Sequence, residues 1–329
     1  MKKIFIGIIG LGVGMHHYKF LKSKKNCEII AVCDFNINKL NKIKNNKIFK
    51  TQNSNELINY NKINTIIISS FDNFHYEQII KSINKKFHIF IEKPICQNKT
   101  QLKNIYKLLD NNKSLAFYSN FNLRFAPEFV KLKNEIINKN FGKIYYIEAS
   151  YNYSRLFKLN KGWRGSSSFY SINQGGAIHM LDLVLFLINL KFKKIICFGN
   201  KIATKNSTYK FNDFSVGLVK FFNSSIILKI SSNFGSNGPH NHGLKIFGTK
   251  KTFIQDYPNI KTFQGDDRSY IYKSKIIPKD KSYKLNTLSY FINLIQNKKN
   301  ILYERKLLFE TMNAIFAMDK SMNKNNDNL

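Results

Sequence analysis

The feature that most constrains the fold is a glycine-rich turn close to the amino terminus. An apolar run, residues 4–9, leads into Gly10, Gly12 and Gly14, and the segment that follows can begin a helix. Glycines at such a turn let the backbone approach a pyrophosphate, and the helix N-terminus offers unpaired N–H groups and a partial positive charge. A plain structural turn is the alternative interpretation. The strand before the glycines and the helix after them favour dinucleotide binding.

An acidic residue closes the next apolar run. Asp34 follows residues 28–33, about twenty residues after the turn, where a carboxylate can accept hydrogen bonds from the ribose hydroxyls of NAD. Phe35 and Asn36 come next, and neither is basic. Because a carboxylate there would repel a 2′-phosphate, the sequence predicts NAD in preference to NADP. The glycine spacing departs from the common G-x-G-x-x-G pattern, since Met15 stands where the third glycine would fall.

Length and hydropathy favour a two-domain protein without a membrane partner. The chain has 329 residues and 43% apolar residues, enough for two cores. Its longest apolar stretch, 181–190, is interrupted by Asp182 and Asn189 and is shorter than the roughly 20 residues that span a bilayer. The amino terminus begins a strand at once and lacks a signal-peptide layout. We therefore expect a cytoplasmic protein that does not act at a membrane.

The chain is strongly basic, with 53 Lys and Arg residues against 20 Asp and Glu residues and a net charge of +33. Nucleic-acid binding is one interpretation. The other is genome composition, because Lys, Asn, Ile, Phe and Tyr, all abundant here, have A/T-rich codons. The lysines spread along the whole chain, and no nucleic-acid-binding motif is present. We expect no nucleic-acid partner, although a basic surface would attract anionic substrates such as sugar nucleotides.

The first 120 residues alternate apolar runs with amphipathic segments. This alternation predicts a parallel, doubly wound α/β sheet, a Rossmann domain over residues 1–120, with the cofactor at the carboxyl ends of the strands. The candidate strands are residues 3–10, 28–34, 65–69, 88–91 and 114–118. The candidate helices are residues 15–23, 37–44, 54–59, 75–84 and 100–112.

The pattern changes after about residue 120. Longer alternating runs predict a mostly antiparallel, meandering sheet in an α+β domain over residues 121–329. The candidate strands are residues 144–153, 194–201, 214–222, 225–233, 243–247 and 252–256. Helices are expected at residues 127–138, 177–188, 283–296 and 305–323, followed by a frayed polar tail, 323–329.

A second motif, Glu92-Lys93-Pro94, lies at the end of a predicted strand. Together with the glycine turn it resembles the glucose–fructose oxidoreductase/inositol dehydrogenase (Gfo/Idh/MocA) family over nearly the whole chain. Further motifs of the family, and of its bacterial members in surface-polysaccharide pathways, occur in order: Ser70 with His75, Asn122 with Arg124 and Pro127, residues 162–165, residues 175–179 with Asp182, and residues 247–250. One departure is Phe71, where the family has proline after the first of these residues.

The resemblance implies NAD(P)-dependent transfer of a hydride between the cofactor and a carbohydrate, cyclitol or nucleotide-sugar hydroxyl or ketone. It places Ser70, His75, Glu92 and Lys93 beside the cofactor, together with the three glycines and Asp34. It also implies a second-domain sheet that covers the cofactor with one face and often forms a homo-oligomer, a dimer or tetramer, with the other.

Three residues are candidates for the chemistry. The resemblance places Lys93 beside the nicotinamide, where it can share the hydroxyl proton. His179 is the natural general acid or base because its ordinary pKa lies near neutrality. Asp182, one helical turn later, orients this imidazole or makes a structural hydrogen bond. Many relatives carry an aspartate where this chain has Gly175, so a Lys–Asp–His relay cannot be transferred whole.

Substrate contacts are predicted from side-chain chemistry. Aromatic faces suit sugar stacking, and Arg suits a phosphate or carboxylate, although core packing is the common fate of aromatics. Two histidines two residues apart would point to opposite faces of a strand, and no third ligand is apparent, so we expect no metal site there. Four cysteines without C-x-x-C spacing indicate neither disulfides nor zinc. The candidates are Arg124, Tyr153, Arg155, Trp163, Arg164, His240 and His242.

Three other functions fit parts of this pattern. A redox-assisted glycosidase, which the family also contains, would hold and recycle its NAD. A non-catalytic NAD-binding regulator is compatible with the missing acid at Gly175 and with the high charge. A nucleic-acid binder ranks last and would bind DNA with a steep salt dependence.

Overall fold

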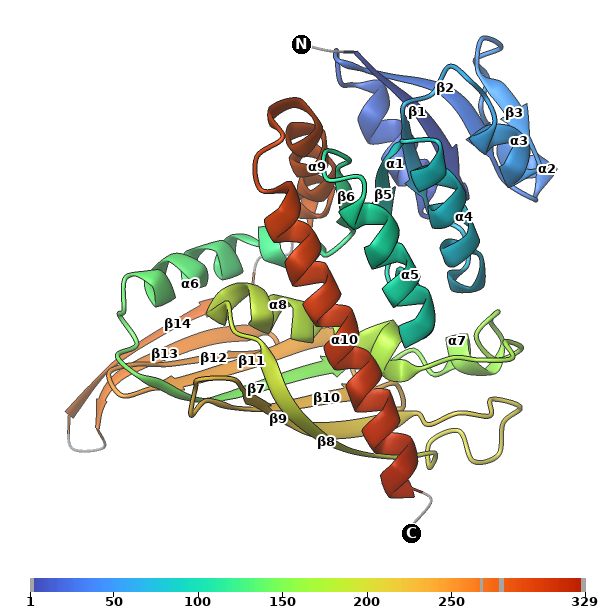
Figure 1. Ribbon diagram of the computed structural model, residues 1–329. Coiled ribbons are helices and arrows are strands. Elements are labelled where there is room, and N and C mark those ends of the chain that lie inside the picture. Colours follow the sequence, from blue (N-terminus) through green and yellow to red (C-terminus); the bar gives the residue numbers. More distant parts are fainter. Residues whose placement is uncertain (1–2, 267–268, 278–280, 327–329) are drawn as a thin grey trace. The chain divides into compact units, whose positions relative to one another are not determined.

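The computed structural model describes residues 3–266, 269–277 and 281–326 (Figure 1). These residues form two compact units. The first comprises the described residues up to 122 together with residues 282–309, and the second comprises the other described residues, those after 122 and before 282 and those from 310 onward. The sequence places one boundary at residue 120 and assigns everything after it to the second domain, whereas in the structure residues 282–309 group with the first unit.

The first unit is built on a parallel sheet of six strands in the order β3-β2-β1-β4-β5-β6, which confirms the predicted Rossmann topology. Its strands are β1 Ile4–Ile9, β2 Cys27–Cys33, β3 Phe49–Thr51, β4 Thr65–Ile68, β5 His88–Ile91 and β6 Phe117–Ser119. Its helices are α1 Gly14–Lys22, α2 Ile37–Leu40, α3 Ser54–Ile58, α4 Asp72–Asn84, α5 Lys99–Asp110, α9 Asn286–Asn297 and the start of α10 Ile301–Asn326.

These elements follow from simple sequence patterns. All four residues of β4 are buried, as expected for a central strand covered on both faces. In α5 the buried residues Leu102, Ile105 and Leu109 recur at helical spacing, and the Asn98 side chain accepts a hydrogen bond from the Gln101 N–H as an N-cap. The edge strand β3, three residues long, was not among the predicted strands.

The carboxyl-terminal part of the first unit is held by aromatic packing and one arginine. Phe291 of α9 lies 5.5 Å, between ring centroids, from Phe90 of β5. Arg305 of α10 donates hydrogen bonds to the carbonyls of Leu109 and Asn112, each at 2.8 Å, and to that of Leu115. A single side chain thus satisfies three carbonyls where α5 turns into β6, which explains why this segment groups with the Rossmann sheet.

The second unit contains an eight-stranded sheet in the order β14-β13-β12-β11-β7-β10-β9-β8. Neighbouring strands are antiparallel except β7 and β10, which pair in parallel. The predicted, mostly antiparallel sheet is therefore confirmed. Its strands are β7 Ile144–Asn152, β8 Phe192–Asn200, β9 Phe214–Phe221, β10 Ile227–Asn233, β11 Asn241–Gly248, β12 Thr252–Asp256, β13 Asn259–Asp266 and β14 Ser269–Ile276.

One face of this sheet is covered by helix. The apolar helix α8 Ile178–Ile188 lies against β7 in Figure 1, and the buried residues Ile147 and Ala149 alternate along that strand. The other helices of the unit are α6 Pro127–Ile137, α7 Phe157–Asn160 and the rest of α10. That helix continues to Asn326, beyond the predicted end at residue 323, and residues 327–329 lie outside the described part of the chain.

The helix predicted to begin at residue 177 is preceded by one turn of π-helix, Asn173–Ala177. This turn is anchored by Asp319 of α10, whose carboxylate accepts hydrogen bonds from Ser171 Oγ at 2.7 Å and from the Asn173 and Gln174 side-chain amides at 2.9 Å each. Because these contacts join residues about 145 positions apart, no local pattern could reveal them. No described helix is long and apolar enough to cross a membrane.

Candidate active site

A cavity of about 230 Å³ opens at the glycine turn of the first unit. Its walls include Gly10, Gly12 and Asp34, together with Phe35 and Phe71, whose ring centroids are 5.9 Å apart. Two adjacent phenyl rings on one wall offer an apolar surface for a flat base attached to a ribose. The pocket lies where β1 and β4 adjoin and the strand order reverses, which is the expected ligand position in a doubly wound sheet.

The glycines meet the geometric needs of a dinucleotide. Gly10 has φ +84°, and a side chain there would collide with the Ser69 carbonyl of the neighbouring strand. At Gly12, by contrast, a side chain would meet only the Lys39 ammonium, 4.0 Å away, and Gly12 lines the pocket. Helix α1 begins at Gly14, against Ile8, so the early third glycine allows close helix–strand packing. These residues fit the predicted cofactor.

Asp34 lies at the end of β2, as predicted for the acid that contacts ribose. Its Oδ2 accepts a hydrogen bond from the Leu11 N–H at 2.6 Å, and its Oδ1 accepts one from the Asn36 N–H at 2.9 Å. The Lys39 ammonium lies 3.2 Å from Oδ2. The residues next to Asp34 in the sequence are not basic, but the short helix α2 brings Lys39, five residues away, back to the carboxylate.

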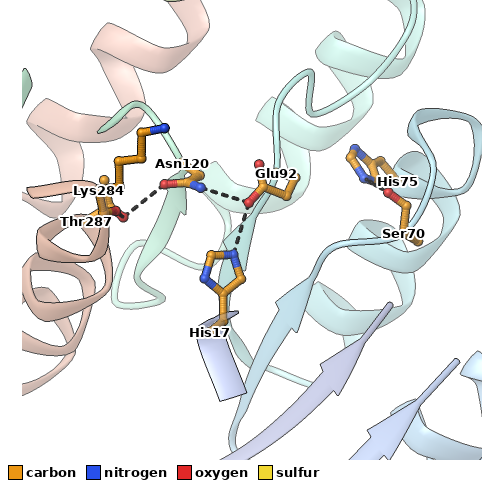
Figure 2. Close-up of polar contacts among 7 residues, drawn as sticks. All are labelled: His17, Ser70, His75, Glu92, Asn120, Lys284 and Thr287. Carbon is orange, nitrogen blue, oxygen red and sulfur yellow. Dashed lines mark hydrogen bonds and ion pairs between the residues drawn. The ribbon is translucent and has the colours of Figure 1, made fainter. Parts of the chain in front are cut away.

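Figure 2 shows a second polar cluster of the first unit, centred on Glu92 at the end of β5. Glu92 Oε1 lies 3.0 Å from His17 Nε2 of α1 and accepts a hydrogen bond from the Asn120 amide at 2.8 Å. The Thr287 hydroxyl of the carboxyl-terminal segment donates in turn to Asn120 Oδ1 at 2.9 Å. Two residues distant in sequence, His17 and Asn120, therefore contact the carboxylate next to Lys93, and Thr287 supports one of them.

The environment of Glu92 favours its ionised form. Burial opposes ionisation, but the hydrogen bonds from His17 and Asn120 and the charge of Lys93 outweigh it, so the pKa of Glu92 is lowered. Both hydrogen-bond donors meet Oε1. Among the described residues, Oε2 accepts no hydrogen bond. The cluster thus holds a fixed negative charge beside Lys93, with one carboxylate oxygen still able to accept.

Removing the His17 contact should be visible in acid unfolding. An ionised Glu92 stabilises the folded state above the ordinary pKa of Glu, and this stabilisation is lost as the pH falls through the lowered folded-state pKa. In His17→Leu that pKa rises, so we expect acid unfolding, followed by circular dichroism, to begin at a higher pH. The exposed neighbour variant His16→Leu is the control. Identical acid transitions in both variants would contradict this role of His17.

His75 and Ser70, both predicted to contact cofactor, have different surroundings. His75 is fully buried, with Nδ1 2.6 Å from the Pro94 carbonyl and Nε2 3.2 Å from the Ser70 carbonyl. Figure 2 shows its ring beside Ser70. The Ser70 hydroxyl donates to the Gln78 side chain at 2.7 Å, and Ser70 itself lines the pocket. His75 therefore ties the turn after Lys93 to the end of β4, which favours a supporting role.

In the second unit, the Tyr151 ring of β7 contacts three histidines that were predicted as site residues. The ring centroids of His179, His240 and His242 lie 5.6, 5.1 and 5.3 Å from that of Tyr151. Burial raises the pKa of Tyr151, so its hydroxyl stays protonated. Tyr153 is buried, and its ring centroid lies 4.6 Å from that of Phe234. This matches the alternative interpretation of Tyr153 as a core residue.

The predicted orientation of the two nearby histidines was wrong. The ring centroids of His240 and His242 are 4.9 Å apart, so the rings share one side of the chain instead of pointing to opposite faces. His240 precedes β11, and its Nδ1 lies 3.0 Å from the Asn152 carbonyl, so strand alternation does not apply to it. No group of three or more His, Cys, Asp or Glu residues in the described chain could hold a metal ion.

The space beside Gly175 is filled by a tyrosine. A side chain at Gly175 would collide with the Tyr170 hydroxyl, which accepts a hydrogen bond from Arg164 Nε at 3.0 Å. The Arg164 guanidinium also lies over the Trp163 ring, 4.6 Å from its centroid, and Arg155 lies over Tyr153 at 5.4 Å. At the position where the resemblance leads one to expect an acid, this chain therefore has a glycine with the Tyr170 hydroxyl, paired with Arg164, packed against it.

Arg124 and Asp182 pair with one another inside the second unit. Arg124 Nε donates to Asp182 Oδ2 at 2.7 Å, and a second bond joins the guanidinium to Oδ1. The two side chains are only 3% and 1% exposed. This bidentate contact favours a structural role for both residues, one of which was expected at the substrate and the other at the catalytic centre.

Several residues of these clusters were not found from the sequence. His17 and Asn120 contact Glu92 from elements far apart in the chain, and Thr287 supports Asn120 in turn. Tyr151 is one aromatic residue among many. Only His17, three residues after Gly14, carried a local signal, since a histidine one turn into α1 can face the sheet.

Comparison with known proteins agrees with this geometry. The family model described as "Oxidoreductase family, NAD-binding Rossmann fold" (GFO/IDH/MocA) matches residues 4–120, and the model of the GFO/IDH/MocA C-terminal domain matches residues 129–254. The chain belongs to the GFO/IDH/MocA oxidoreductase family. It is therefore an NAD(P)-dependent oxidoreductase.

Individual relatives are distant. Myo-inositol 2-dehydrogenase of Thermotoga maritima is 23% identical over 76% of this chain and 75% of the relative. D-glucoside 3-dehydrogenase of Escherichia coli is 24% identical over 70% of each chain. The solved structure of scyllo-inositol dehydrogenase from Lactobacillus casei, with NAD(H) and scyllo-inositol, has a TM-score of 0.80 at 18% identity and covers 98% of each chain. This GFO/IDH/MocA member thus shares the fold over 98% of its length.

Proposed function

We propose that this enzyme transfers a hydride between NAD(H) and a secondary hydroxyl or ketone of a carbohydrate, a cyclitol or, in our preferred form, a nucleotide-linked sugar of a surface-polysaccharide pathway. The bound cofactor would accept or donate the hydride. The observation that carries the proposal is the joint presence, in the first unit, of the dinucleotide pocket and the charged Glu92-Lys93 corner at the ends of adjacent parallel strands β4 and β5.

The first unit supplies binding and charge. Gly10, Gly12 and Asp34 would hold the diphosphate and ribose, and the adjacent Phe35 and Phe71 rings would pack against the adenine. Lys93, held beside an ionised Glu92, would take or return the hydroxyl proton as the carbonyl forms or is reduced.

The second unit supplies substrate contacts. His179 is half-buried and stacks on Tyr151, with His242 beside it, and an imidazole in this setting suits proton transfer. Trp163 offers a face for sugar stacking, and Arg155 and Arg164 suit the phosphates of a nucleotide sugar. The inositol and glucoside dehydrogenases among the relatives are named for polyhydroxylated ring substrates, which supports this substrate class.

His179→Asn should slow hydride transfer by about 10²–10⁴-fold, because the amide cannot act as a general acid or base near neutral pH. Stopped-flow measurement of NADH absorbance in a single turnover isolates this step. The matched variant His240→Asn removes a neighbouring imidazole but leaves His179 and His242 in place. We expect it to slow hydride transfer less than His179→Asn does. Loss of folding in His179→Asn, with a normal His240→Asn, would show that His179 is structural.

A substrate screen tests the function as a whole. Purified protein with NAD is offered UDP-sugars, GDP-sugars, free sugars and inositols, and NADH fluorescence is followed. Formation of NADH with one class identifies the substrate. Tightly held NAD that cycles without net NADH release, together with cleavage of a glycoside, would identify the redox-assisted glycosidase instead.

We also propose a cytoplasmic homo-oligomer, a dimer or tetramer. The sheet face opposite α8 exposes Ile196, Phe198, Leu218 and Ile227, each 40–52% exposed, on three adjacent strands. An apolar patch of this kind is typical of an interface between subunits. Sedimentation equilibrium of the purified chain tests the oligomeric state. Cell fractionation tests whether the protein lies in the cytoplasm, the compartment in which NAD and nucleotide sugars are available.

A further inference from the structure

The ribose end of the dinucleotide pocket carries two opposite charges. Asp34 and Lys39 are the charged residues among those that line it. The Asp34 side chain is 1% exposed, and its two oxygens already accept from two backbone N–H groups and from Lys39. The Lys39 side chain is 32% exposed. A ligand that reaches this end of the pocket therefore meets the ammonium more readily than the carboxylate.

Lys39 is held where the glycine turn and the acid adjoin. Its Nζ lies 4.0 Å from the position that a Gly12 side chain would occupy and 5.4 Å from the Phe35 ring centroid. The ammonium thus lies between the expected diphosphate site, the ribose acid and one wall of the adenine pocket. An ammonium has three N–H donors, and only one is needed for Asp34, so the others can serve a ligand.

We propose that Lys39 lets this pocket accept the 2′-phosphate of NADP(H) as well as the 2′-hydroxyl of NAD(H). The inference rests on the proposed function, in that the dinucleotide must bind here. An isolated carboxylate would repel a phosphate, but this carboxylate accepts from three donors, one of them the Lys39 cation, so the local charge is balanced. Ser54, which also lines the pocket, offers a hydroxyl as a further donor.

The test is a pair of fluorescence titrations of the full-length protein, one with NADH and one with NADPH. For the unmodified chain we expect dissociation constants within about tenfold of one another, and NADPH binding should weaken more steeply with added salt because it involves an extra charge pair. In Lys39→Gln, NADPH should bind at least about tenfold more weakly, while NADH changes by less than about threefold. Lys42→Gln, an exposed lysine just past α2, is the matched control.

The outcomes separate this inference from the function on which it rests. If the unmodified chain binds NADH but binds NADPH at least about 100-fold more weakly, the inference is overturned and the proposed function stands. Equal NADPH affinity in Lys39→Gln and Lys42→Gln also overturns it. Absence of binding by both cofactors overturns the proposed function itself. Melting temperatures of the two variants verify that each is folded.

Discussion

Lys93→Met is expected to lower turnover by about 10²–10⁴-fold while cofactor affinity stays within a few-fold. Methionine keeps the length and apolar stem of lysine but removes the ammonium, so the reacting hydroxyl loses its proton partner. The cofactor contacts assigned to Gly10, Gly12 and Asp34 are unaffected. Steady-state NADH formation measures turnover, and fluorescence titration measures binding.

Lys99→Met is the matched control for Lys93, because it removes an exposed lysine six residues away at the start of α5. Its turnover should equal that of the unmodified chain. If Lys93→Met turns over normally, Lys93 takes no part in the reaction. If it binds neither cofactor nor substrate, its role is binding, and the proton must be transferred by another group.

The second large effect concerns stability. Arg124→Met leaves the Asp182 carboxylate, 1% exposed, without its guanidinium. Removing one partner of a buried ion pair destabilises a protein by about 3–5 kcal/mol, because the remaining charge stays buried without compensation. Urea unfolding measures this loss. We expect the double variant Arg124→Met with Asp182→Leu to recover much of it, since both charges are then gone.

This pair of variants also decides between the two roles of Asp182. If the double variant recovers stability and retains most of its turnover, Asp182 is structural. If it recovers stability but loses turnover about 100-fold or more, Asp182 acts on the reaction as the sequence predicted. Lys3→Met, which breaks an exposed ion pair with Glu28, should change the free energy of unfolding by less than about 1 kcal/mol.

Local patterns were sufficient for the framework of both units. The order of strands and helices in the Rossmann sheet follows from alternating apolar runs and turns, and strands such as His88–Ile91 and Thr252–Asp256 have the predicted bounds. Short sequence motifs also located three sites: the glycine turn, Asp34 and the Glu92-Lys93-Pro94 corner. Each lies in one short stretch of sequence, and its chemistry depends on neighbours a few residues away.

Contacts between distant residues could not be predicted in this way. Asn120 and Thr287 meet over a separation of 167 residues, and the Arg124–Asp182 pair spans 58. Even Lys39, five residues from Asp34, was missed, because its return to the carboxylate depends on how the chain turns in α2.

Local periodicity and short motifs in the sequence therefore determined the Rossmann sheet and the dinucleotide pocket, and the resemblance carried by the Glu92-Lys93-Pro94 motif identified the fold family and the candidate reactive lysine. The tertiary structure alone decided which charges those groups face: a histidine on Glu92, a lysine on Asp34, an arginine on Asp182 and a tyrosine against Gly175. The physical reason is that electrostatic environment depends on distance in space, and chain folding sets that distance independently of separation along the sequence.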